Sequence, residues 1–220
     1  MSIETYYAKR AHEYERIYAK PERQDDLVTL RELVQKTFRG KRVLEVACGT
    51  GYWTEVLARS AASVTAVDIN EEVLELARVK SLNARFERAD VYALPKFSEP
   101  FDAGLAAFWW SHIRKARLAA FLAQFHGAFA PGATVVFIDN LHVEGSSTPI
   151  SRTDAEGNTY QSRRLDDGST HEVLKNFPTE DELHRAVDGL GRQIRIRFLE
   201  YYWILTYATL QPSPRSQLGR

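Results

Sequence analysis

The residues best suited to chemistry lie between Val43 and Asp68. The run Val43–Ala47 is apolar except for Glu45, and it leads directly into Cys48-Gly49-Thr50-Gly51. Glycines that follow a buried strand let a ligand approach the backbone closely, outside the carboxyl end of a parallel sheet. Asp68 closes a second apolar run seventeen residues after Gly51, about where a carboxylate accepts the two hydroxyls of a bound ribose. The pattern predicts a site for a ligand that contains a ribose.

Glu45 and the glycines narrow the choice of ligand. A carboxylate inside an apolar strand should not be ionised without a partner, so we expect Glu45 to meet a ligand cation or a ring of backbone donors. The nicotinamide fingerprint needs glycine at three spaced positions, which here hold Ala47, Gly49 and Tyr52. The acid at Asp68 also argues against a phosphorylated ribose. A glycine-rich turn that binds no ligand is the alternative.

The pattern E-x-A-x-G-x-G over residues 45–51 resembles the first motif of class I S-adenosylmethionine (SAM)-dependent methyltransferases, with Ala47 in place of the usual first glycine. Four further motifs follow in that family's order, over residues 64–68, 84–91, 101–108 and 131–138. On this ordered set, the chain is identified as a member of the family over roughly residues 40–140.

The resemblance implies SAM as the cofactor, S-adenosylhomocysteine (SAH) as its product, and no metal. In the family, the acid matching Asp90 takes the adenine amino group and the residue matching Val91 covers the ring. The segment 6–14 resembles a family helix that lies over the cofactor, although an amphipathic helix that only packs on the sheet is the alternative. The residues expected to bind the cofactor are Tyr7, Arg10, Tyr14, Glu45, Ala47, Gly49, Thr50, Gly51, Trp53, Asp68, Ile69, Asp90, Val91, Ala107 and Phe108.

Aromatic residues and a histidine follow the fourth motif, in the sequence Phe108-Trp109-Trp110-Ser111-His112. The family places this segment beside the transferred methyl group, where aromatic rings can hold a sulfonium through cation–π attraction. His112 is the candidate general base if the acceptor is a hydroxyl, because the ordinary pKa of histidine lies near neutrality. A histidine at a helix start without a role in proton transfer is the alternative.

A basic segment near an Asp-Gly turn is the candidate acceptor site. Two strands joined at Asp167-Gly168 would bring Arg163 and Lys175 near one another, where they could clamp an acidic group or serve only as solvated charges. This half of the chain resembles hydroxyalkylphosphonate O-methyltransferases, in which an arginine and a lysine matching these two hold the anion. Pro21 replaces a tyrosine that also binds the anion there. The residues expected to bind substrate are Tyr18, Trp109, Arg163, Arg164 and Lys175.

The elements that position these residues follow a β-α alternation, which is typical of a doubly wound α/β sheet. Strands are expected over 42–47, 63–68, 84–89, 101–107, 133–139, 193–200 and 201–210. Helices are expected over 3–20, from Asp25 or Asp26 to Phe38, and over 51–60, 71–80, 114–128 and 179–188, with Asn70 capping the fourth. We therefore expect a Rossmann-like, seven-stranded, mostly parallel sheet with helices on both faces and the last strand antiparallel.

A single domain over residues 1–210 is the expected organisation. It would consist of an N-terminal helical lid (1–38), a SAM-binding core (40–140) and a substrate-lid insertion (141–177), and a flexible tail would follow at 211–220.

Composition excludes several classes of partner. The 220 residues contain 29 basic and 29 acidic side chains, so no net field attracts nucleic acid or anionic membranes. No apolar run reaches the length of a membrane span, and the amino terminus lacks a signal-peptide pattern. Cys48 is the only cysteine, which rules out a disulfide within the chain. We expect a cytoplasmic monomer or homodimer that acts on a small molecule.

These observations predict methyl transfer from SAM to a small anionic metabolite by in-line displacement, with oxygen as the acceptor atom. Methylation of nitrogen or sulfur is an alternative, and so is a SAM-binding module without catalysis.

Overall fold

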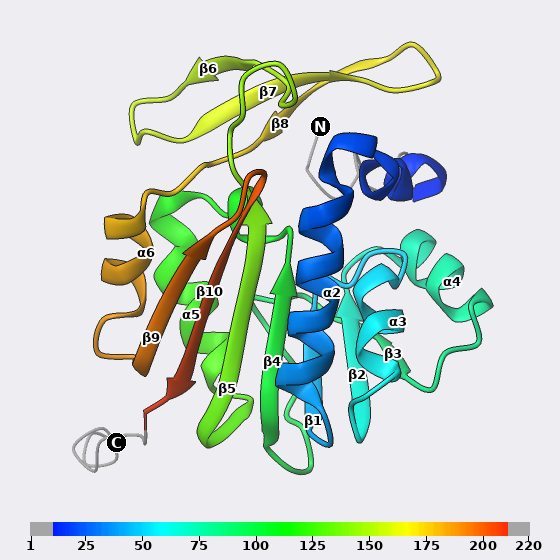
Figure 1. Cartoon of the computed structure of the whole chain (residues 1–220), viewed down its shortest axis with the longest axis vertical. Coiled ribbons are helices and arrows are strands. Elements are labelled where there is room, and N and C mark those ends of the chain that lie inside the picture. Colours follow the sequence, from blue (N-terminus) through cyan, green and yellow to red (C-terminus); the bar gives the residue numbers. More distant parts are fainter. Residues whose placement is uncertain (1–10, 211–220) are drawn as a thin grey trace.

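The computed structural model describes residues 11–210, and its centre is one seven-stranded sheet (Figure 1). The strand order is β3-β2-β1-β4-β5-β10-β9. The strands are β1 (Arg42–Val46), β2 (Ser63–Asp68), β3 (Arg85–Arg88), β4 (Phe101–Ala107), β5 (Phe129–Asn140), β9 (Gly191–Phe198) and β10 (Tyr202–Thr209). β10 runs antiparallel to both of its neighbours, and the other pairs are parallel. The expected Rossmann-like sheet with an antiparallel last strand is confirmed.

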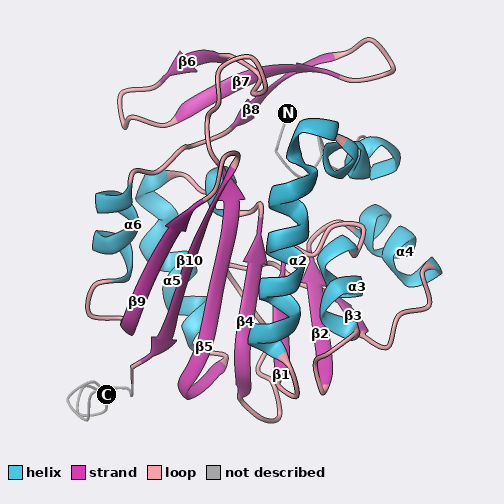
Figure 2. Ribbon diagram, viewed as in Figure 1, coloured by secondary structure: helices cyan, strands magenta, loops and turns pink. Residues whose placement is uncertain are grey.

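Helices cover both faces of this sheet, as Figure 2 shows. The α-helices are α2 (Gln24–Phe38), α3 (Tyr52–Ala58), α4 (Glu71–Val79), α5 (Leu118–His126) and α6 (Glu180–Val187). Short 3₁₀ helices are η1 (Ala11–Ala19), η2 (Pro21–Arg23), η3 (Trp110–His112) and η4 (Lys115–Arg117). Side chains alternate along a strand, so Val43 of β1 packs with α2 and α3 while Leu44 packs with α5. Two apolar cores result, one on each face.

Several expected helix details are wrong. The predicted helix over 3–20 is a 3₁₀ helix where it is described, and residues 1–10 lie outside the described part of the chain. Neither Asp25 nor Asp26 caps α2, because both lie in its first turn; the Asp26 carboxylate instead accepts a hydrogen bond from the Tyr201 backbone N–H at 2.8 Å. Asn70 stands at the N-cap of α4 without a side-chain capping bond. The helix expected over 114–128 is split into η4 and α5.

The insertion after β5 forms a second, three-stranded antiparallel sheet, which we call the lid. Its strands are β6 (Ile150–Thr153), β7 (Thr159–Arg164) and β8 (Thr170–Leu174). The lid lies beyond the carboxyl ends of the parallel strands (Figure 1). Register pairs Arg163 with His171 and Arg164 with Thr170. Arg163 and Lys175 are therefore not a cross-strand pair of this hairpin, although both line one cavity.

Two asparagines fasten the lid to the loop after β4. Asn176 donates its backbone N–H to the Ser111 carbonyl at 2.8 Å and its side-chain amide to the Ile113 carbonyl at 2.9 Å. The Asn158 side-chain oxygen accepts the backbone N–H of Lys115 at 2.9 Å. These bonds hold the lid over the segment that contains His112. No helix in the described range 11–210 is long and apolar enough to cross a membrane.

Candidate functional site

Two neighbouring cavities lie at the carboxyl edge of the large sheet. The first, the sheet-edge cavity, encloses about 840 Å³ including its open mouth. Nine residues singled out from the sequence line it: Ala47, Gly49, Asp68, Ile69, Asp90, Val91, Phe108, Trp109 and His112. Segments far apart in the chain therefore meet around one space, as the order of the strands requires.

The turn after β1 exposes its backbone to this cavity. Ala47, Gly49 and Gly51 all have positive φ angles, of 53°, 55° and 81°. Alanine is less suited than glycine to this conformation, at a cost of roughly 1–2 kcal/mol. A Cβ on Gly51 would lie 3.1 Å from the Cβ of Ala77, so a side chain there would push α4 away. The turn thus needs a small residue at Gly51 for packing.

Asp68 is the buried acid of the sheet-edge cavity. Its two oxygens accept backbone N–H groups of Gly49 at 2.9 Å and Asn70 at 3.0 Å. Burial raises the pKa of Asp68, and the backbone hydrogen bonds oppose that rise. An ionised carboxylate has about four acceptor sites, so the group can still accept hydrogen bonds from ligand hydroxyls.

The far wall of this cavity combines an acid with apolar and aromatic groups. Asp90 accepts the backbone N–H of Tyr92 at 2.8 Å, and the neighbouring Val91 is buried. The guanidinium of Arg117 lies 3.8 Å from the centre of the Tyr92 ring. Neither Tyr92 nor Arg117 was predicted from the sequence, because neither residue stands in a distinguishing pattern.

Glu45 does not have the partner expected for it. Its carboxylate accepts the Thr54 hydroxyl at 2.6 Å, is buried and does not belong to the lining of the sheet-edge cavity. Its hydrogen-bond partner in the structure is thus a side-chain hydroxyl and not a ring of backbone donors. Burial raises the pKa of Glu45 to about 8, although the Thr54 hydrogen bond acts in the opposite direction.

Other expected cofactor residues also lie outside this lining. Thr50 donates its hydroxyl to Glu15 of η1 at 2.8 Å. Trp53 and Tyr18 belong to a buried aromatic cluster, in which the ring centroids of Tyr18 and Tyr52 are 3.6 Å apart. Ala107, the last residue of β4, is buried in the core. Tyr7, Arg10 and the side chain of Tyr14 lie outside the described residues.

The second cavity, the lid cavity, lies between the large sheet and the lid and encloses about 1190 Å³ including its mouth. Five basic side chains line it, and no Asp or Glu does within the described part of the chain. These side chains are Lys20, Arg23, Arg163, Arg164 and Lys175. Phe108 and His112 line both cavities, so the two spaces meet at these residues. Tyr18 and Trp109, expected to contact substrate, do not line the lid cavity.

Lys175 forms an ion pair that the sequence did not reveal. Its ammonium lies 3.0 Å from Asp139 Oδ1 and donates to the Ser111 hydroxyl at 2.6 Å, with both charged side chains buried. Burial opposes ionisation of Asp139, yet the ammonium of Lys175 holds its pKa below the ordinary value. The only sequence signal was an acid at the end of the apolar run 135–138.

The ring of His112 has a defined orientation. Its Nδ1 lies 2.7 Å from the Leu174 carbonyl oxygen, and a carbonyl only accepts, so Nδ1 bears the proton. Burial lowers the pKa of His112 well below its ordinary value, and the positive charge of Lys175 lowers it further. A neutral ring with its proton on Nδ1 has a basic lone pair on Nε2.

Comparisons with known proteins agree with this geometry. A family of methyltransferase domains matches residues 43–132. The structure of a DhpI–SAH complex is 29% identical and superposes with a TM-score of 0.77 over 95% of this chain and 96% of that one. A complex of DhpI with SAM and HEP is 28% identical, with a TM-score of 0.76 over 94% and 95%. The chain is thus similar to SAM-binding methyltransferase structures over nearly their whole length, and a methyltransferase-domain family matches its central part.

Curated relatives match a shorter part. The ubiquinone biosynthesis O-methyltransferase of Coxiella burnetii is 38% identical over 72 residues, 31% of each chain. An uncharacterized methyltransferase of Mycobacterium tuberculosis is 36% identical over 98 residues, 44% of this chain and 49% of that one. The match thus spans a third to a half of the length of these relatives.

Replacing Glu45 should change how stability depends on pH. The folded pKa of about 8 exceeds the ordinary 4.5, so the folded protein holds a proton that the unfolded chain releases. This group therefore lowers the free energy of unfolding as pH rises between those values, by up to about 1.4 kcal/mol per pH unit. In urea unfolding, the free energy of unfolding of Glu45→Gln relative to the wild type should therefore rise as pH increases from about 5 to about 8. The exposed Glu75→Gln is the control; equal trends for both variants would contradict this assignment.

Removing Lys175 should leave the buried Asp139 carboxylate without a counter-charge. We expect Lys175→Met to lower the free energy of unfolding by about 3–5 kcal/mol, because a buried charge loses its partner. The double variant Asp139→Asn/Lys175→Met should recover most of that loss. Denaturant unfolding of the two variants measures these free energies. A double variant no more stable than Lys175→Met would show that the loss of stability does not come from the broken ion pair.

Proposed function

We propose that this protein transfers the methyl group of SAM to an oxygen atom of a small anionic metabolite. The observation that supports this is the meeting of two chemically different cavities at Phe108 and His112. The sheet-edge cavity offers carboxylates and apolar walls, whereas the lid cavity is lined by basic side chains. A cationic donor and an anionic acceptor would each meet the surroundings that favour it.

The sheet-edge cavity suits SAM. Asp68 retains acceptor sites for the ribose hydroxyls, and Asp90 would accept the adenine amino group. Val91 and Ile69 supply apolar contacts for the ring. The side chain of Trp109 adds an aromatic wall to this cavity. When bound, SAM supplies a methyl group made electrophilic by its sulfonium.

The protein's own contribution is alignment, exclusion of water and proton removal. Phe108 is buried at the junction and holds a positive φ of 58°, which turns the chain directly after β4. Its ring and the ring of Trp109 would keep water from the methyl group. The lone pair on His112 Nε2 would accept the proton of an acceptor hydroxyl. An acceptor carboxylate or phosphonate oxygen would already be charged and would need no base.

The name of one relative favours oxygen as the methylated atom. The Coxiella burnetii relative is named an O-methyltransferase. Nitrogen or sulfur methylation, and a SAM-binding protein without catalysis, are the competing functions. Mass spectrometry of candidate hydroxy acids and phosphonates incubated with protein and SAM distinguishes them, because the position of an added methyl identifies the atom.

Binding of SAH tests the donor site. We expect calorimetric titration to detect SAH binding to the wild type and no comparable binding of NADH. Asp68→Ala should weaken SAH binding by roughly tenfold or more, because a buried acceptor of ligand hydroxyls is lost. Glu55→Ala, on the outer face of α3, is the control for loss of one carboxylate. A wild type that binds neither SAH nor SAM would refute the proposed function.

Replacing His112 tests the proposed base. With a hydroxyl acceptor, His112→Asn should lower kcat by roughly 10²–10⁴-fold and leave the Kd of SAH near the wild-type value. Since burial lowers the pKa of His112, the wild-type rate should not fall when pH drops from about 7 to about 6. An unchanged kcat in the variant would exclude the base role.

A further inference from the structure

Arg23 is a buried cation at the wall of the lid cavity. Its side chain belongs to η2, which begins at Pro21 and leads directly into α2. Proline sets the backbone at the start of such a turn, so the position of Arg23 is well defined. The residue is 6% exposed and lines the lid cavity.

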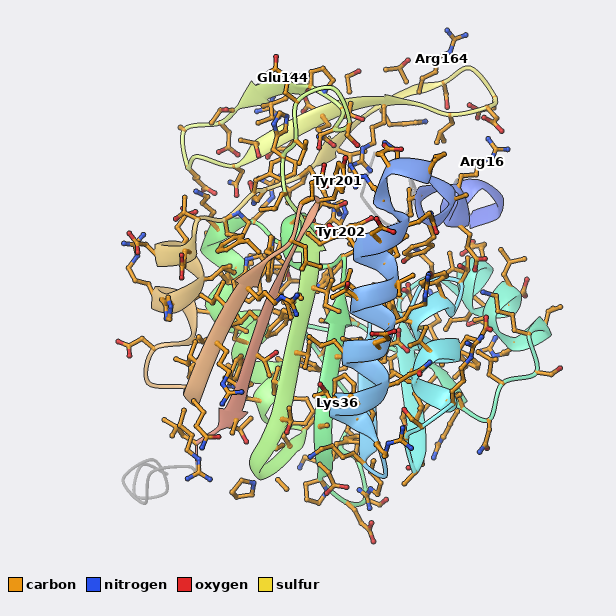
Figure 3. All side chains as sticks on the ribbon, in the orientation of Figure 1. Arg16, Lys36, Glu144, Arg164, Tyr201 and Tyr202 are labelled. Carbon is orange, nitrogen blue, oxygen red and sulfur yellow. The ribbon has the colours of Figure 1, made fainter. Side chains whose placement is uncertain are left out.

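Neutral groups hold the guanidinium in place. It donates to the Ser146 hydroxyl from Nη2 at 2.9 Å and to the Asn140 side-chain oxygen from Nη1 at 3.0 Å. Its carbon lies 5.1 Å from the ring centre of Tyr201 and 5.5 Å from that of Tyr202. Figure 3 places these two tyrosines at the turn between β9 and β10, below the lid. Stacking and hydrogen bonds therefore fix the plane of the guanidinium before a ligand arrives.

Arg23 differs from Lys175 in its counter-charge. Lys175 has Asp139 at 3.0 Å, whereas no carboxylate oxygen among the described residues lies within 4.0 Å of the Arg23 guanidinium. The nearest acid along the hydrogen bonds is the exposed Glu22, which accepts the Ser146 hydroxyl at 2.9 Å and lies 3.7 Å from Lys20. Burial of a charge is costly unless an opposite charge compensates it, so the Arg23 site favours an anion.

We propose that Arg23 determines acceptor specificity by binding the oxyanion of the acceptor from the side of the cavity opposite the lid. This inference rests on the proposed function and adds a residue to it. Asp139 already neutralises Lys175, whereas Arg23 brings to the cavity a positive charge that no carboxylate among the described residues pairs with. The fork of a guanidinium matches the paired oxygens of a carboxylate, phosphonate or phosphate. The acceptor is therefore a small molecule that carries such a group.

Arg23 reaches the same cavity as Arg163 and Lys175. Cations from the N-terminal helices and from the lid therefore line one space.

Titration with inorganic phosphate tests this assignment. We expect the wild type to bind phosphate, with and without SAH present, and Arg23→Gln to raise the phosphate Kd by roughly thirtyfold or more. Arg23→Lys, which keeps the charge and loses the fork, should give an intermediate Kd. Arg59→Gln, which removes a positive charge from an exposed pair with Glu55, is the control and should leave the phosphate Kd unchanged. The SAH Kd should be unchanged in all three variants.

The outcomes separate the two proposals. An Arg23→Gln protein with wild-type phosphate affinity would overturn the specificity role, and so would equal losses of phosphate and SAH affinity together with a lower Tm, which would indicate a structural role. A wild type that binds SAH without binding phosphate would also overturn it and leave methyl transfer intact. A wild type that binds phosphate in an Arg23-dependent manner but never binds SAH would refute the methyltransferase proposal and leave the anion site standing.

Discussion

A buried carboxylate at the carboxyl end of β5 governs how the two sheets of this protein are joined. Asp139 is fully buried, and leaving it without a cation would cost several kcal/mol. The cation comes from Lys175, directly after the last strand of the lid, at 3.0 Å. The same carboxylate accepts the Ser111 backbone N–H at 2.8 Å. One charge thus connects the end of the central sheet, the loop after β4 and the lid.

The two cavities beside this connection differ in the charge of the side chains that line them. The carboxyl ends of β2 and β3 place Asp68 and Asp90 on one side, and the lid with the N-terminal helices places the arginines on the other. Phe108 and His112 stand between them because β4 ends at the centre of the sheet. A sheet with this strand order brings the two cavities together at its middle strand, and the lid covers the one lined by basic side chains.

Local sequence patterns predicted the fold well, but they did not predict contacts between residues far apart in the chain. Strands such as Ser63–Asp68 and Phe101–Ala107 were recovered because a continuous apolar run and its closing residue are both local features. The glycines and Asp68 came from spacing within one strand-turn-helix unit. The Asp139–Lys175 pair joins positions 36 residues apart, and its existence depends on how the lid docks. Arg23 was missed for the same reason, since its neighbours Asn140 and Ser146 lie more than a hundred residues away in sequence.

Glu45 shows a different limit. The sequence correctly marked its carboxyl as unsuited to ionisation inside a strand, but the partner is the Thr54 hydroxyl nine residues later. A hydroxyl satisfies a protonated carboxyl as readily as a ligand would, so burial of an acid alone does not indicate a binding role.

The bond from His112 Nδ1 to the Leu174 carbonyl links the histidine ring to the edge of the lid itself. The tautomer and the tilt of the imidazole therefore depend on where the end of β8 lies. A displacement of that strand would break the bond and free both the ring and its proton to reorient. The geometry of the histidine is in this way coupled to the seating of the small sheet.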